Sequence, residues 1–340
     1  MDPISQAALG AGFAQSGARR SKLVPATIVG CLAGMAPDAD IVIQSTTDPL
    51  LFLEYHRHFT HSLLFIPFGA AICAGVFYWF ARRSLSWAEC YLFCFLGYAS
   101  HGVLDACTTY GTLLFWPLSS DRVAWDIVSV VDPAFTLPVI ALTVLAYRRR
   151  RRWFAVGALG WACVYLGLGT IQHDRAMTVG AELARSRGHT ALGARAMPSI
   201  ANLLLWRHVY AHGGRLYVDA VRVGIETEVF EGSSLRSVDA AQLEWLDPSS
   251  TQAHDLERFA HFADGYLGIA ADQPNRIVDL RYSALPSDVV GIWSIVLDPA
   301  AAPDAHVSFL TSRTAGEGGA GKLFRMLAGR AEVDQRFDHP

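Results

Sequence analysis

The chain has 340 residues, of which 52% are hydrophobic and 17% are charged. Soluble globular proteins carry about 25% charged residues, so this composition favours a membrane protein. No basic face with interleaved aromatic residues is present, which excludes nucleic acid as an expected partner. The net charge of -3 averages two unlike halves, an apolar first half with clustered arginines and a second half of mixed charge.

Apolar runs divide the first half into candidate membrane spans. A short helix of small residues is expected over 4–16, too short to cross a bilayer. The candidate spans after it are residues 23–43, 63–81, 87–104, 134–147 and 153–171. A spanning helix needs roughly 20 residues, so the run 134–147 must draw on its flanks.

Three basic clusters separate these runs and predict their orientation. They are Arg19, Arg20 and Lys22, then Arg82 and Arg83, and then five consecutive arginines from Arg148 to Arg152. Under the positive-inside rule each cluster marks a cytoplasmic helix end. Threading the chain between them places three polar clusters together on the opposite, extracytoplasmic face. These are Asp38 with Asp40, the segment from His56 to His61, and His101 with Asp105.

These three clusters carry residues suited to binding a divalent metal. Histidine is the commonest metal ligand, and aspartates inside apolar segments are functional candidates by default. His101 and Asp105 are four residues apart, so on a helix they share one face. The plainer alternatives are an interfacial turn at Asp38 and Asp40, and a polar cap before the next apolar run. The predicted metal ligands are Asp38, Asp40, His56, His61, His101 and Asp105.

Neighbouring side chains are expected to assist these ligands. Arg57 is suited to an anionic oxygen of a substrate, because its guanidinium is planar, permanently charged and bidentate. Arg57 and Asp105 are therefore the candidate catalytic residues. Thr60 and Ser62 are expected to support the ligands through hydrogen bonds.

The second half has a different pattern. Residues 172–212 are expected to be helical, with His208 and His212 on its surface rather than in a metal site. Apolar and polar residues alternate over 216–223 and 276–282, as in half-buried strands, and 291–297 is a further strand candidate. The expected fold is mainly α, a polytopic helical membrane domain (1–171) followed by a smaller α+β extramembrane domain (172–313). The same threading places this second domain on the extracytoplasmic side. A flexible tail is expected over 314–340, where glycines cluster.

Several motifs resemble the YdjM-like family, described as LexA-binding, inner-membrane-associated, metal-dependent hydrolases. The motifs are Pro37-Asp-Ala-Asp40, His56-Arg-His-Phe-Thr-His-Ser62, Gly97-Tyr-Ala-Ser-His-Gly-Val-Leu-Asp105, Thr109-Tyr-Gly111, Phe115-Trp-Pro117 and Asp132. The resemblance covers about residues 1–150 and adds Asp132 as a supporting residue. His58 stands where the family has glycine, so it is not expected as a shared ligand. Gln6 stands where the family has histidine; if that histidine is a ligand, its replacement weakens one metal position.

The resemblance implies a multi-pass protein of the bacterial inner membrane. The expected activity is hydrolysis of a phosphoester or lipid-linked substrate by metal-activated water, with zinc, or else manganese, as the cofactor. A more distant similarity is to zinc-dependent phospholipase C enzymes. The expected partners are the lipid bilayer and this lipid or phosphoester substrate.

Two other functions stay open at this point. A non-enzymatic membrane protein could use the same clusters as a structural metal or polar clasp, with the C-terminal domain as an interaction module. A proton-relay transporter fits less well, because its polar groups should lie near the bilayer midplane and these lie at helix ends.

Overall fold

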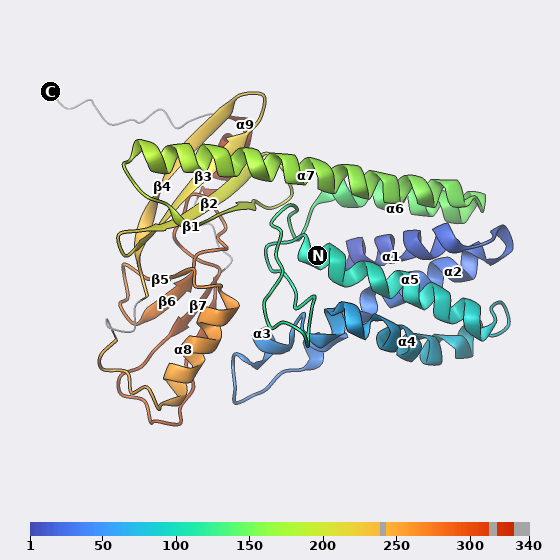
Figure 1. Ribbon diagram of the computed structural model, residues 1–340, viewed down its shortest axis with the longest axis horizontal. Helices are drawn as coiled ribbons and strands as arrows, with labels where there is room; N and C mark the ends of the chain where they lie inside the picture. The colour runs from blue at the N-terminus through green and yellow to red at the C-terminus, as the bar shows by residue number, and fades with distance from the viewer. Residues whose placement is uncertain (239–242, 313–317, 330–340) are drawn as a thin grey trace. The chain divides into compact units, whose positions relative to one another are not determined.

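The computed structural model describes residues 1–238, 243–312 and 318–329, and its elements are labelled in Figure 1. The chain forms two compact units. The first comprises Met1–Ile171 with Ile200–Asn202, and the second comprises Gln172–Ser199 with Leu203–Pro340.

The first unit is helical. Its helices are α1 (Pro3–Gly17), α2 (Leu23–Met35), α3 (Leu51–Tyr55), α4 (Ile66–Ala81), α5 (Trp87–Ala106), α6 (Pro133–Arg149) and the first part of α7 (Arg152–Ser186). Short 3₁₀ segments connect them: η1 (Arg20–Lys22), η2 (Ala36–Val42), η3 (Phe59–His61) and η4 (Leu63–Phe65). α1 packs against α2, α5 and α6, while α4 packs against α5.

Local sequence signals fix where these helices begin. Asp2 caps α1 by accepting hydrogen bonds from the amides of Ile4 and Ser5. α5 begins with a capping box in which Ser86 and Glu89 each bond the other's backbone amide. Such caps satisfy the amides that a helix N-terminus leaves unpaired.

The expectation of a polytopic helical membrane domain is wrong. In the described part of the chain, two segments are long and apolar enough to cross a membrane, Leu63–Ala81 and Arg152–Ser186. α2 ends after 13 residues, because the chain turns into the 3₁₀ segment η2 at Pro37. α6 has 17 residues, and α5 reaches 20 residues only by including polar side chains that it buries. A bilayer span needs roughly 20 predominantly apolar residues, which these three helices do not supply.

Among its described residues, the second unit is built on an antiparallel sheet of eight strands in sequential order. The strands are β1 (Leu192–Pro198), β2 (Leu205–His212), β3 (Arg215–Val223), β4 (Thr227–Ser237), β5 (Leu267–Ile269), β6 (Arg276–Asp279), β7 (Trp293–Val296) and β8 (Ser308–Thr311). Helix α8 (Thr251–Phe262) lies between β4 and β5 in the chain. This sheet is more extensive than the three strand runs expected from the sequence.

The stretch 172–212 is helical only as far as Ser186, where α7 ends. β1 and β2 follow, so His208 and His212 lie on a strand rather than on a surface helix. His208 is fully buried. Tertiary pairing overrides local helical pattern here, because β2 bonds to both β1 and β3 along its length.

Part of the stretch expected as a tail forms helix α9 (Gly319–Ala328). Its Met326 is buried in a small hydrophobic cluster with Leu205 and Ala220 of the sheet. Residues 314–317 and 330–340 lie outside the described residues.

Candidate metal centre

Asp38 and Asp40 reach the site through the 3₁₀ segment η2. Pro37 occupies the first turn of this segment, where its fixed φ and missing N–H are tolerated. The carboxylate of Asp40 is fully buried, and that of Asp38 is 22% exposed. Asp38 is therefore the more accessible of the two.

The histidine-rich segment bends sharply after α3. Arg57 has a φ of 61°, in the left-handed region, and η3 follows two residues later. This bend turns the side chains of His56 and His61 towards η2, so that both histidines contact Asp40.

His101 and Asp105 lie one turn apart on the same buried face of α5. Between them, Gly102 lets the chain of η3 approach closely. A Cβ atom at Gly102 would lie 2.2 Å from the backbone oxygen of His61. The absence of a side chain at this glycine is what seats His61 against α5.

Four donor atoms from these segments face one another. The Nε2 atoms of His61 and His101 are 3.0 Å apart. Asp38 Oδ1 lies 3.4 Å from His61 Nε2 and 3.3 Å from His101 Nε2. Asp105 Oδ2 lies 3.2 Å from His61 Nε2 and 3.4 Å from His101 Nε2. The four atoms form a compact cage.

The other ring nitrogens show which tautomers the two histidines adopt. His101 Nδ1 lies 2.6 Å from the carbonyl oxygen of Gly34, which can only accept, so Nδ1 carries the proton. His61 Nδ1 lies 2.9 Å from Thr60 Oγ1, whose hydroxyl already donates to Asp40 Oδ2. His61 Nδ1 is therefore the donor as well. Both Nε2 lone pairs then point into the cage, an arrangement that a shared cation stabilises.

The spacing of the four atoms fits a tetrahedral metal ion. Zinc binds imidazole nitrogen and carboxylate oxygen at about 2.0–2.2 Å, for which the edge of a regular tetrahedron is about 3.4 Å. Five edges of the cage run from 3.0 to 3.4 Å. Asp105 Oδ2 is buried and accepts no hydrogen bond from the described residues. These residues fit a divalent metal.

The electrostatics of the cage favour bound positive charge. Burial alone would lower the pKa of His61, but the carboxylates of Asp105, Asp38 and Asp40 outweigh it and raise that pKa to about 9. Burial likewise opposes ionisation of Asp38, yet His101 and His61 hold its pKa below the usual range. In the absence of an ion, His61 is therefore protonated at neutral pH and supplies the positive charge that the carboxylates stabilise.

Asp40 and His56 form a second group with Asp38. Asp40 Oδ1 lies 2.9 Å from His56 Nδ1, and its Oδ2 accepts from the Arg57 amide at 2.9 Å and the Thr60 hydroxyl at 2.8 Å. Both oxygens of Asp40 thus hold the segment from His56 to Thr60 in place.

Arg57 lies against the inner side of the cage and is 4% exposed. Its Nε is 3.2 Å from Asp105 Oδ2, its Nη1 donates to Thr108 Oγ1 at 3.0 Å, and its guanidinium lies 4.7 Å from the centroid of the Tyr110 ring. Burial opposes the charge of Asp105, but Arg57 and the Met1 amine hold the pKa of that carboxyl well below its usual range. The predicted role of Arg57 as a substrate ligand stays a prediction.

Three residues considered from the sequence do not reach the cage. Ser62 caps η4 and donates to the Phe59 carbonyl. Asp132 caps α6, and the single hydroxyl of Tyr165 donates to its carboxylate, 2.8 Å from both oxygens. The ring of His58 packs 5.4 Å from that of Trp116. Ser62 and Asp132 therefore stabilise helix ends in this unit.

Other contributors were not expected from the sequence. Gln6 donates to Asp105 Oδ1 at 2.9 Å, and Tyr98 donates to the Thr60 carbonyl at 2.8 Å. Thr108 and the carbonyl of Gly34 contact Arg57 and His101, as described above. Gln6 could have been found from the sequence, because it stands where the family has a histidine. The Gly34 carbonyl could not, because every residue has a backbone carbonyl.

Comparison with known proteins identifies the family. Residues 1–176 match the family described as YdjM inner membrane protein, which is more than half of the chain. The chain belongs to the YdjM inner membrane protein family. The inner membrane protein YbcI of Escherichia coli is 31% identical over 122 residues, covering 34% of this chain and 69% of YbcI.

A second similar protein is YfhP of Bacillus subtilis, described as uncharacterized. It is 27% identical over 136 residues, covering 40% of this chain and 39% of YfhP, so the match spans well under half of that relative. No solved structure matches the chain. The family resemblance read from the motifs is confirmed, and with it an inner membrane assignment; the fold of the second unit lies mostly beyond the matched residues.

Proposed function

We propose that this protein is a membrane-bound, metal-dependent hydrolase whose divalent ion, of the zinc type, is held by Asp38, His61, His101 and Asp105. The observation that supports this is the cage of four donor atoms at tetrahedral spacing, with both histidine tautomers set towards it. Chance contacts between polar side chains do not require two imidazole lone pairs to face each other at 3.0 Å.

A divalent ion at this place supplies Lewis acidity, which lowers the pKa of water towards about 7 and polarises a phosphoryl or acyl oxygen. The chain's own groups hold the donor set in position. Asp40 and Thr60 orient His61, and the Gly34 carbonyl orients His101. Arg57 compensates the negative charge of Asp105. Asp38 has the only partly exposed carboxylate of the four donors, so substrate approaches from its side.

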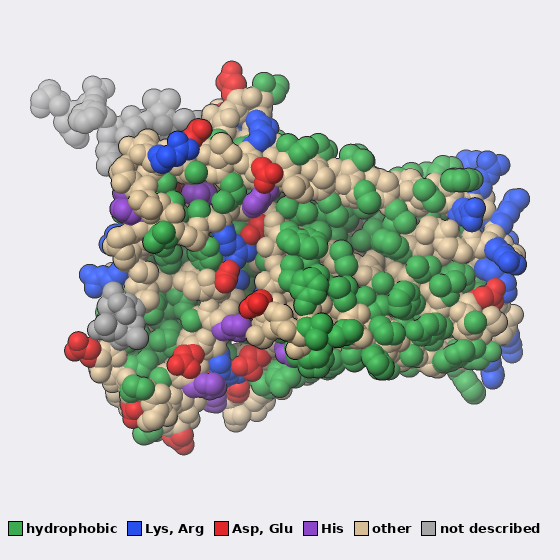
Figure 2. All heavy atoms as spheres, in the orientation of Figure 1, with side chains coloured by type: hydrophobic (Ala, Val, Ile, Leu, Met, Phe, Trp, Pro, Cys, Tyr) green, Lys and Arg blue, Asp and Glu red, His purple; other side chains and the backbone are tan. Residues whose placement is uncertain are grey.

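The proposed substrate is a phosphoester or lipid-linked molecule, because a site at the ends of apolar helices meets lipid head groups first. We place the site on the extracytoplasmic face. Basic residues flank one end of each membrane-length segment, with Arg82 and Arg83 after Leu63–Ala81 and Arg148–Arg152 at the start of Arg152–Ser186, and by the positive-inside rule we take these ends as cytoplasmic. Figure 2 shows Lys and Arg side chains gathered beyond the apolar surface of the helices. His61 directly precedes Leu63, at the other end of the first of these segments.

A structural metal clasp is the second candidate, and one observation favours it. Structural zinc sites are closed by four protein ligands, whereas catalytic sites keep a position for water. Here four protein donors are available and three of their side chains are fully buried. The two candidates differ in whether the Asp38 carboxylate can leave its position at the metal so that water or substrate can bind there.

Elemental analysis of the detergent-purified protein tests the metal. We expect about one equivalent of zinc or manganese, lost in the His61→Ala, His101→Ala double variant. The matched control replaces two exposed histidines of α8, His254→Ala and His261→Ala, and should keep the metal. No metal in the wild-type protein, even after reconstitution, would overturn both candidates and leave a polar packing cluster.

Hydrolysis assays across a panel of phosphoester and lipid-linked substrates then separate the two candidates. For a hydrolase, metal-loaded wild-type protein releases product and the double variant does not. Metal-loaded protein that is inert across the panel, but unfolds when the metal is chelated, establishes the clasp instead.

A further inference from the structure

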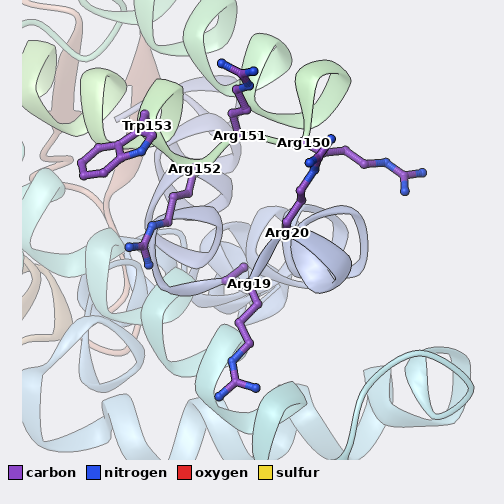
Figure 3. A pocket seen from close by; sticks show the side chains of 7 residues that line it. Arg19, Arg20, Arg150, Arg151, Arg152 and Trp153 are labelled. Atoms are coloured by element: carbon purple, nitrogen blue, oxygen red, sulfur yellow. The ribbon is translucent and has the colours of Figure 1, made fainter.

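The first unit carries an arginine-lined pocket of about 380 Å³, well away in sequence from the metal ligands (Figure 3). Besides the buried Ala18, five arginines and one tryptophan line it: Arg19, Arg20, Arg150, Arg151, Arg152 and Trp153. All six are exposed. The pocket lies within the size range of small-ligand sites, which begins at about 300 Å³.

Two turns that are distant in sequence build this pocket. α1 ends at Gly17, and the extended residues Ala18 and Arg19 lead into η1. α6 ends at Arg149, Arg150 takes a left-handed φ of 50°, and α7 begins at Arg152. A non-glycine residue in this conformation is uncommon, and here it makes the abrupt reversal that brings the second turn beside the first.

The positive charge of the pocket is not neutralised within the described part of the protein. None of the five arginines forms an ion pair there, whereas nearby Lys22 does pair with Glu89, at 3.3 Å. Figure 3 shows Arg20 reaching towards Arg150, while Arg19 and Arg151 extend in opposite directions. Positive charges gathered on two adjacent turns repel one another, and an anion bound in the pocket would relieve that repulsion.

The surroundings of the pocket indicate where that anion comes from. The apolar segment of α7 starts at Arg152, and Trp153 is 71% exposed. At the end of α4, beside the next basic turn, Trp79 is 67% and Phe80 is 80% exposed. Exposed aromatic side chains next to basic residues are typical of the headgroup level of a bilayer, where anionic lipids are the abundant anions.

We propose that the pocket binds the phosphodiester headgroup of an anionic phospholipid of the cytoplasmic leaflet. Guanidinium groups bind phosphate oxygens bidentately, and the indole of Trp153 lies at the boundary where headgroup meets acyl chain. The site fixes the first unit at a defined depth in the membrane. It is independent of the metal centre, since the two sets share no residue.

Native mass spectrometry of the full-length protein in detergent tests the proposal, with phosphatidylglycerol as the probe and phosphatidylcholine as the zwitterionic comparison. The Arg150→Gln, Arg151→Gln, Arg152→Gln variant should bind phosphatidylglycerol at least tenfold more weakly. The matched control, Arg82→Gln, Arg83→Gln, Arg148→Gln, removes three exposed positive charges outside the pocket and should change binding less than twofold.

Three results would overturn the proposal. The first is equal loss of binding in the two triple variants, which would mean general surface charge. The second is equal binding of phosphatidylcholine by the wild-type protein. The third is displacement of the lipid by low-millimolar glycerol phosphate, which would identify a soluble phosphate ligand. Partial recovery of binding when the three pocket arginines are replaced by lysine would support it, because lysine keeps the charge but not the bidentate geometry.

Discussion

The carboxylate of Asp40 shows how one residue supports a site without being one of the four cage donors. It contacts His56, at the end of α3, and His61 of η3, and it accepts a hydrogen bond from the Arg57 amide. The sequence predicted Asp40 as a metal ligand because it lies two residues from Asp38 in an apolar stretch. Its hydrogen bonds indicate that its larger contribution is to orient His61.

Replacing Asp40 tests that contribution at the residue scale. In Asp40→Asn one oxygen becomes an amide donor, so His61 loses its carboxylate partner while the four cage donors stay in place. We expect metal affinity to fall about 10- to 100-fold, the usual cost of losing a partner behind a ligand, with the fold retained. Competition with a chelator of known affinity measures it.

Asp121→Asn is the control for charge, because Asp121 is exposed and, among the described residues, its carboxylate accepts a hydrogen bond only from the Ser119 hydroxyl, to which its own amide donates. Its metal affinity should equal that of the wild type. Should Asp40→Asn remove the metal entirely, as replacement of His61 is expected to, Asp40 would have to be counted among the direct ligands.

At the scale of elements, α5 and η3 approach closely at Gly102, where any side chain would collide with the η3 backbone. The backbone oxygen of His61 occupies the space of the missing side chain. Sequence analysis could pair His101 with Asp105 from their spacing alone, since helical geometry fixes which residues share a face. It could not foresee Gly102, because the contact partner is 41 residues away in the chain and is a backbone atom.

Gly102→Ala is therefore expected to push η3 off α5. A gain in helix propensity of about 1 kcal/mol is outweighed by overpacking, which costs typically 1–3 kcal/mol in a packed interior. We expect the thermal unfolding midpoint to fall and the metal content to drop below half of wild type.

The matched substitution is Gly75→Ala in α4, where an added Cβ meets no atom within 4 Å. It should leave both measurements unchanged or raise the midpoint slightly. Equal behaviour of the two alanine variants would refute the view that Gly102 seats His61.

At the scale of the whole molecule, the second unit contains a buried group that makes stability depend on pH. His208 is fully buried in β2, and neither of its ring nitrogens has a hydrogen-bond partner among the described residues. A Cβ atom on Gly180 of α7 would lie 2.3 Å from its ring, so helix and strand pack tightly there. Burial lowers the pKa of His208 from 6.5 to about 4 despite the nearby carboxylate of Asp219.

The sign of the pH effect follows from which state binds the proton. Between about pH 6.5 and pH 4 the unfolded chain protonates His208 and the folded protein does not, so stability is complete above pH 6.5 and is lost as the pH falls. We expect the free energy of unfolding to decrease by about 2 kcal/mol between pH 7 and pH 5 from this residue. Urea unfolding followed at the two pH values measures the difference.

His208→Gln cannot bind that proton and should remove about 2 kcal/mol of the pH dependence, whatever its effect on absolute stability. The control His254→Gln, on the exposed face of α8, should leave the dependence intact. An unchanged dependence in His208→Gln would show that other groups are responsible.

The sequence by itself determined the residue types of the candidate site, because metal chemistry demands histidine and carboxylate and the motifs carry both. It also determined the family, since the motif order over the first half is specific. Tertiary structure decided which oxygen and nitrogen atoms face one another, and that Arg57 is buried with its Nε 3.2 Å from Asp105 Oδ2. It also decided the number of membrane-length helices and the eight-stranded sheet. Helix length depends on where turns and caps end each run, and strand pairing depends on partners far away in the chain, so neither can be read from hydropathy alone.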